Sequence, residues 1–110
     1  GVRTGTITVA SGANLIEGYS FVNDPMVPNE LGAPAGSNVK DLLGADIDTQ
    51  SSVTVTGADN DFITIFPAAS NNSYAIRFSD GTYMLLQHTA GAGVGATVKY
   101  RYQPNGTSSF

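Results

Sequence analysis

The stretch from residue 52 to residue 103 constrains the fold most, because short runs of alternating apolar and polar residues follow one another there almost without a gap. Successive side chains of a strand point to opposite faces of a sheet, so a period of two predicts strands. The predicted strands cover residues 52–56, 62–66, 73–78, 82–87 and 96–102. The pattern predicts an antiparallel β domain, with a hairpin turn at Asp80-Gly81.

The first half of the chain adds further predicted strands. Residues 2–9 are rich in Thr and Val, whose branched side chains favour the pleated conformation. Residues 13–22 form a second predicted strand, with Gly18 as a bulge, so that residues 2–22 form either a hairpin or an arm followed by a strand. Residues 23–36 contain prolines, which cannot donate to a ladder, and predict an extended surface connection.

One segment, residues 37–44, carries a helix pattern. Ser37 can cap its first turn, Gly44 can end it in the left-handed conformation, and the apolar residues between them share one face. The chain therefore predicts an all-β fold, an antiparallel β-sandwich of about seven or eight strands with jelly-roll or immunoglobulin-like topology and one short helix. A length of 110 residues predicts a single domain over residues 1–110.

Charge and composition exclude several classes of partner. Charged residues make up 13% of the chain and the formal net charge is −4, which argues against a nucleic-acid partner. No segment approaches the roughly 20 apolar residues of a membrane span. A surface of Ser, Thr, Asn and Gly suits an extracellular, cell-surface or virion-surface location.

The sequence does not indicate a catalytic site. His88 is the only histidine, and no Gly-x-Ser-x-Gly nucleophile motif accompanies it. The chain has no cysteine, so thiolate chemistry is absent and the usual zinc ligands are too few. We therefore predict a protein that is not an enzyme and that needs no cofactor, with calcium as the one ion considered.

Calcium and glycans define the alternative function, a small extracellular carbohydrate- or calcium-binding module. The turn Asp59-Asn60-Asp61 offers oxygen ligands of the type that Ca²⁺ prefers, although the same residues also favour ordinary turns. The module would further present tyrosines as platforms for sugars. Glycosylation sequons begin at Asn71 and Asn105, and they matter only in a host that glycosylates exported proteins.

The function that the sequence favours is that of a structural subunit, which assembles with copies of itself into a filament, coat or particle surface. Residues 1–10 could act as a donor arm that adds as a strand to a neighbour, and Phe110, in a polar tail of residues 104–110, could anchor in an adjacent pocket. The predicted assembly residues are Val2, Thr4, Thr6, Ile7, Val9 and Phe110. In composition and strand pattern the whole chain resembles small β-sandwich subunits of viral and extracellular fibres, without a diagnostic motif.

Overall fold

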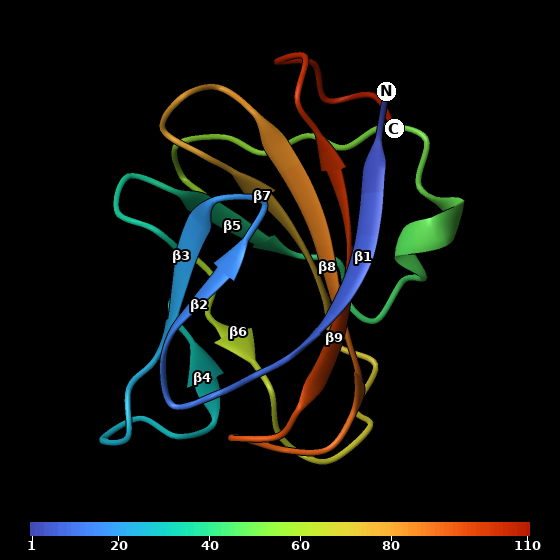
Figure 1. The fold of residues 1–110 in the computed structure, drawn as a ribbon. Helices are drawn as coiled ribbons and strands as arrows, with labels where there is room; N and C mark the ends of the chain where they lie inside the picture. Colours follow the sequence, from blue (N-terminus) through green and yellow to red (C-terminus); the bar gives the residue numbers. More distant parts are fainter.

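Two antiparallel layers face each other in the computed structural model, which describes residues 1–110 (Figure 1). The larger layer has five strands in the order β1-β9-β8-β7-β5. Their bounds are β1 Arg3–Thr8, β5 Asn38–Asp41, β7 Ser73–Arg77, β8 Tyr83–Ala90 and β9 Thr97–Gln103. The predicted antiparallel β-sandwich is confirmed.

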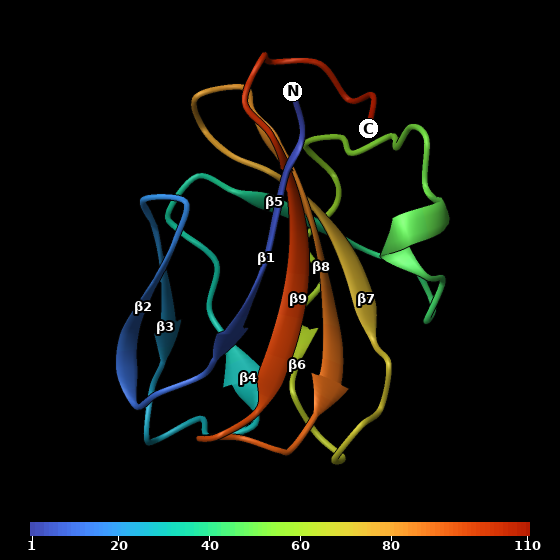
Figure 2. The ribbon, with the colours of Figure 1, turned by 45° about the vertical axis from the view of Figure 1, so that its right-hand side comes forward.

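The second layer consists of two short strand pairs that lie side by side. Its strands are β2 Gly12–Ile16, β3 Tyr19–Asn23, β4 Glu30–Leu31 and β6 Ile63–Thr64, paired as β2-β3 and β4-β6. A bridge between Val22 and Gly32, in which each N–H donates to the other's carbonyl at 2.9 and 2.8 Å, joins the two pairs. Figure 2 shows the β2-β3 pair to the left of β1, β9, β8 and β7.

The core lies between the layers, because alternate residues of the strands point inward. Phe21 and Ile16 come from the β2-β3 hairpin, and Ile76, Met84 and Leu86 face them from the large sheet. A smaller apolar cluster lies on the opposite face of the large sheet, where Ile47, Val55, Ala75 and Leu85 are buried together. The central strands β7 and β8 are therefore covered on both faces.

The helix predicted for residues 37–44 is wrong. Residues 38–41 form β5, which pairs with β7 from Asn38 opposite Arg77 to Asp41 opposite Tyr74. Leu43 shows why the helical face failed, since its side chain is 89% exposed in a turn and its φ is 56°. In the strand, the backbone N–H and C=O groups of alternate β5 residues form hydrogen bonds with β7, which is buried. A single isolated helical turn provides less stabilisation than this pairing. The one helical element is the 3₁₀ turn η1, Ile47–Thr49.

Two other predictions of local structure also need correction. Residues 52–56 form no strand, and only Ser52 makes a bridge, to Ser109, while Val55 covers the smaller cluster. Gly18 is not a bulge, because Glu17 and Gly18 form the two-residue turn between β2 and β3, with φ values of 52° and 83°. Positive φ at both turn positions matches the right-handed twist of hairpin strands. The hairpin is therefore formed by β2 and β3. The residues before it form a separate strand, β1, which pairs with β9.

The remaining predicted strands of the second half are found. Residues 73–78, 82–87 and 96–102 correspond to β7, β8 and β9, and residues 62–66 retain the short strand β6. The hairpin at Asp80-Gly81 is confirmed, with the Phe78 N–H donating to the Thr82 carbonyl at 2.9 Å. The structure contains no helix with the length and apolar character needed to cross a membrane.

The Asp80 turn is tied to the β2-β3 hairpin by a polar network that should make stability depend on pH. The Tyr19 hydroxyl donates to Asp80 and lies 2.7 Å from the Thr82 hydroxyl and 2.9 Å from that of Tyr102. Burial raises the pKa of Tyr19, and hydrogen bonds from the hydroxyls of Thr82 and Tyr19 lower the pKa of Asp80. A carboxyl group whose pKa is lower in the folded protein than in the unfolded chain stabilises the fold at pH values above its unfolded pKa. This contribution is lost as the pH falls through the pKa of the folded protein.

We therefore expect Asp80→Asn to reduce stability more at about pH 6 than at about pH 3, because pH 3 lies below the usual carboxyl pKa of an unfolded chain and part of the stabilisation by the charge is already lost there. Urea unfolding of both proteins at the two pH values measures this difference. An equal loss at both pH values would contradict the role of the Asp80 charge. Asp24→Asn is the matched control, because the Asp24 carboxylate accepts only the local Met26 N–H, at 2.9 Å.

Candidate assembly edge

The strand β1 lies at one edge of the large sheet and pairs only with β9, from Arg3 opposite Tyr102 to Thr8 opposite Thr97. The same register continues to Val9, whose N–H donates to the Ala96 carbonyl at 2.7 Å. Backbone groups of an antiparallel strand point alternately to its two sides. The odd-numbered residues therefore bond to β9, and the N–H and C=O groups of Thr4, Thr6 and Thr8 point away from the sheet, where no protein group bonds to them.

The opposite edge of the same sheet is covered. The Val39 N–H of β5 donates to the Asp59 carbonyl at 3.3 Å, and the Val39 carbonyl accepts from the Asp61 N–H at 2.9 Å. The segment around Asn60 thereby bridges to β5 in parallel orientation. The five-stranded sheet is consequently open to backbone pairing on the β1 side alone.

The side chains of β1 divide between core and solvent as the alternation predicts. Thr4, Thr6 and Thr8 are exposed, whereas Ile7 packs against the main core and Val9 belongs to it with 1% of its surface exposed. In this structure the predicted donor arm is thus a strand of its own domain, and its apolar side chains fill its own core. Exchange of this strand between copies stays a prediction.

Three contacts fix β1 in place on its inner face. The Tyr100 ring lies directly over Gly5, where a Cβ atom would come within 2.6 Å of the tyrosine hydroxyl. The Arg3 side chain donates to Glu17 at 2.8 Å and lies over the Tyr102 ring, 5.3 Å from its centre. These contacts all involve the inner face of the strand and leave its outer edge free.

β1 carries few of the devices that usually protect an edge strand from other chains, and its one charged residue, Arg3, is paired with Glu17. Such edges commonly carry a proline, a bulge, or charges that disfavour pairing. The ladder between β1 and β9 has no register shift, and Thr4, Thr6 and Thr8 are uncharged. By contrast, the ladder between β8 and β9 shifts its register between His88 and Ala90, inside the sheet. The edge of β1 therefore has unpaired backbone groups and little that would obstruct a further strand.

The cations of the chain are all engaged within it. Each of the five lies on the large sheet and contacts an acid, an amide or a backbone carbonyl. The contacts are Arg3 to Glu17, Lys40 to the Thr54 carbonyl, Arg77 to Asn38, Lys99 to Asp46 and Asp48, and Arg101 to the carbonyls of Ile47 and Gln50. The N–H donors of these cations are thus used within the chain, and neutral backbone groups are the better basis for self-association.

Phe110 contacts its own domain. Its N–H donates to the Ser51 carbonyl at 2.9 Å, and its ring packs on the smaller cluster. The guanidinium carbon of Arg101 lies 5.7 Å from the centre of that ring. Part of the Phe110 surface remains exposed. Its role as an anchor in a neighbouring copy stays a prediction.

The residues predicted to bind calcium serve as turn residues. The Asp59 carboxylate accepts the Thr56 N–H at 2.8 Å, and the Asp61 carboxylate accepts the Asp41 N–H at 2.9 Å. Asn60 lies between them on the segment that covers β5. The structure gathers no group of three or more His, Asp or Glu side chains that could hold a metal ion.

The other predicted sites are distributed over the surface and the core. Asn71 and Asn105 are both exposed, and the Asn105 side chain accepts from the Thr107 N–H at 3.0 Å. Tyr19, Tyr83 and Tyr100 are partly exposed, whereas Tyr74 and Tyr102 are buried, and the presentation of tyrosines to sugars stays a prediction.

His88 is fully buried and has a structural set of partners. Its Nε2 faces the carbonyl oxygens of Ala90 at 3.0 Å and Gly91 at 2.6 Å. Carbonyls only accept, so Nε2 carries the proton, and Nδ1 accepts from the Ser70 hydroxyl at 2.7 Å. This histidine joins two loops.

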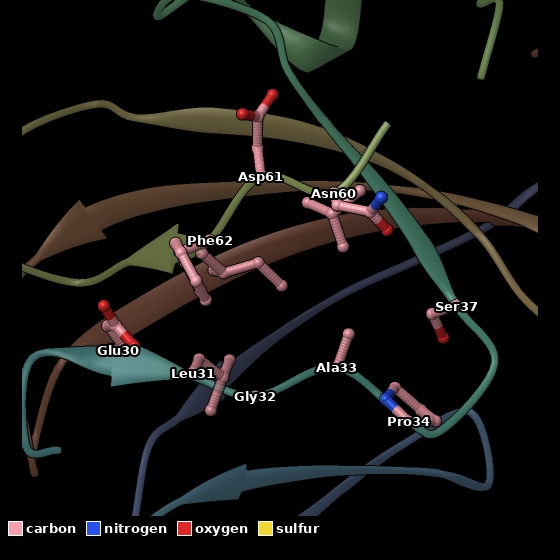
Figure 3. Close-up of a pocket in the computed structure, with 11 residues that line it drawn as sticks. Glu30, Leu31, Gly32, Ala33, Pro34, Ser37, Asn60, Asp61 and Phe62 are labelled. Carbon is pink, nitrogen blue, oxygen red and sulfur yellow. The ribbon is translucent and has the colours of Figure 1, made fainter. Parts of the chain in front are cut away.

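Sequence reasoning missed a hollow of about 340 Å³ beside β4 and β6. Leu31, Val39 and Ile63 line its apolar part, and Glu30 and Asp61 lie at its rim (Figure 3). The hollow joins residues 30–39 to residues 60–63, which are distant in sequence. No local motif could have indicated it.

The comparisons with known proteins add no family. No protein-family model, curated protein sequence or solved structure matches the chain.

Proposed function

We propose that this protein is a structural subunit that assembles with copies of itself by strand addition at β1, in a filament, coat or particle surface outside the cell or on a virion. The observation that supports this most is the free edge of β1, where Thr4, Thr6 and Thr8 offer unpaired backbone groups. Strand addition obtains its affinity from main-chain hydrogen bonds and needs no charged partner. The engagement of every cation within the chain agrees with such a neutral contact.

Thr6→Pro tests the edge selectively. A proline removes an N–H, and the Thr6 N–H points away from β9, so the variant keeps the pairing of β1 within its own sheet. We expect the native protein to form multi-subunit particles by light scattering and electron microscopy, and Thr6→Pro to lose at least tenfold in association constant.

Thr6→Ala is the matched control, since it removes the same side chain and keeps the N–H, and it should assemble like the native protein. A native protein that stays monomeric at micromolar concentration would refute the proposed function.

A polar hollow supports a second candidate function, the binding of a glycan. The hollow measures about 270 Å³ and has only polar or small lining residues. Asp46, Asn71, Gln87, Thr89 and Lys99 contribute side chains that can bond to hydroxyl groups. Glycan binding that is lost in Thr89→Val would favour this candidate over assembly.

A further inference from the structure

We infer that β1 pairs antiparallel with β1 of a second copy, with Thr6 opposite Thr6 of the other copy across a two-fold axis. This inference rests on the proposed function and specifies its contact. It predicts one continuous sheet made from the two five-stranded sheets, with β1 of each copy at the centre.

The partner strand follows from which edges are open. The β5 edge is covered by Asp59 and Asp61, so a β1 strand cannot add there. The edge of β2 is open but shorter. The backbone groups of Val22 point towards Gly32 and away from β2, so those of its opposite residue, Ala13, point away from β3. By the same alternation only Leu15 follows Ala13, and β2 therefore has two residues with outward backbone groups. Only β1 offers three outward residues, and its best complement on another copy is the same strand.

The register follows from the alternation of backbone groups. The outward groups belong to even-numbered residues, so hydrogen-bonded pairs between two β1 strands must join even-numbered residues. With Thr6 opposite Thr6, Thr4 lies opposite Thr8, and all outward groups of both strands are bonded. If one strand were shifted by one residue, the outward groups of the threonines would face residues whose backbone groups already bond to β9. If it were shifted by two residues, one threonine at the end of β1 would have no partner inside the other β1 strand.

The side chains are compatible with this register. Each cross-strand pair on the outer face joins two threonines, and such pairs are favourable in antiparallel sheets. On the inner face, Gly5 of one copy lies opposite Ile7 of the other, which places Ile7 beside the Tyr100 ring that covers Gly5. No like-charged residues face each other between positions 4 and 8.

The pairing is isologous, because each copy contributes the same surface. An isologous contact closes after two copies. The β1 contact therefore yields a dimer, and a larger assembly would join such dimers through a different surface.

Single cysteines test the register directly, since the chain has no cysteine of its own. Opposed residues of a hydrogen-bonded pair have Cα atoms about 5.5 Å apart, within the range that a disulfide spans. We expect full-length Thr6→Cys to give a disulfide-linked dimer as the main product of mild oxidation on a non-reducing gel.

Thr4→Cys is the matched control on the same face and strand. Two copies of it would place their cysteines about 13 Å apart, too far for a disulfide, whereas a mixture of Thr4→Cys and Thr8→Cys should cross-link between the two variants. Dimers from Thr4→Cys alone at the yield of Thr6→Cys would indicate random collision and overturn the register. If the native protein assembles but Thr6→Cys does not cross-link, the two-fold pairing is wrong and the proposed function stands; if the native protein is monomeric, both fail.

Discussion

Phe21→Ala is expected to lower the free energy of unfolding by about 3–5 kcal/mol, the range typical for removing a buried phenylalanine. Phe21 is fully buried on β3 and is among the largest side chains of the core. Its ring meets Phe78 edge to face, with the ring centres 6.0 Å apart, and so connects the second layer to the large sheet. The loss of stability has two parts. The first is the hydrophobic free energy of burying the ring, and the second is the cost of a cavity that the neighbouring strands cannot fill.

Urea unfolding followed by circular dichroism measures this loss. Val22→Ala is the matched control on the same strand, because Val22 points outward and is 44% exposed, and it should cost less than about 1 kcal/mol. Similar losses for the two variants would mean that the two layers do not form one cooperative core.

His88→Leu is expected to cost about 2–4 kcal/mol, although leucine has a similar size and the site is buried. The substitution leaves the Ser70 hydroxyl and the carbonyls of Ala90 and Gly91 without their partner, and unpaired buried groups are expensive. The loss should be visible as a lower urea midpoint with an unchanged slope.

His88→Gln retains a donor and an acceptor on a shorter side chain and should recover part of the loss. Thr89→Val is the neighbouring control, since Thr89 is half-buried and its hydroxyl donates to one carbonyl, that of Thr97, at 3.2 Å. A neutral His88→Leu variant would show that the histidine is not a structural connection between the loops.

Two of the correctly predicted strands, β7 and β8, are neighbours both in sequence and in the sheet. β7 and β8 meet through the turn at Asp80-Gly81, so local residues specify both the strands and their pairing. Residues 52–56 alternate equally well, yet they cover a cluster as an extended segment, because periodicity does not show whether a partner strand is present. For residues 37–44, tertiary pairing outweighed a weak helical pattern.

The candidate site was predicted only in part. The sequence indicated residues 2–9 as a strand with a threonine face, and the structure places the strand there. That β1 lies at the open edge depends on strand order, which alternation does not encode. The cover over β5 likewise comes from residues 59–61, whose composition indicated a turn and a weak calcium site.

The pairing of the first strand with the last affects the order in which the domain can fold. Arg3 lies opposite Tyr102, so nearly the whole chain must be synthesised before β9 exists for β1 to meet. Contacts of such long sequence separation form slowly, on the order of milliseconds to seconds in all-β proteins. During that interval the edge of β9 that later receives β1 is unpaired. If copies exchange this strand as predicted, the local concentration of chains while they fold would decide whether a strand is kept or exchanged.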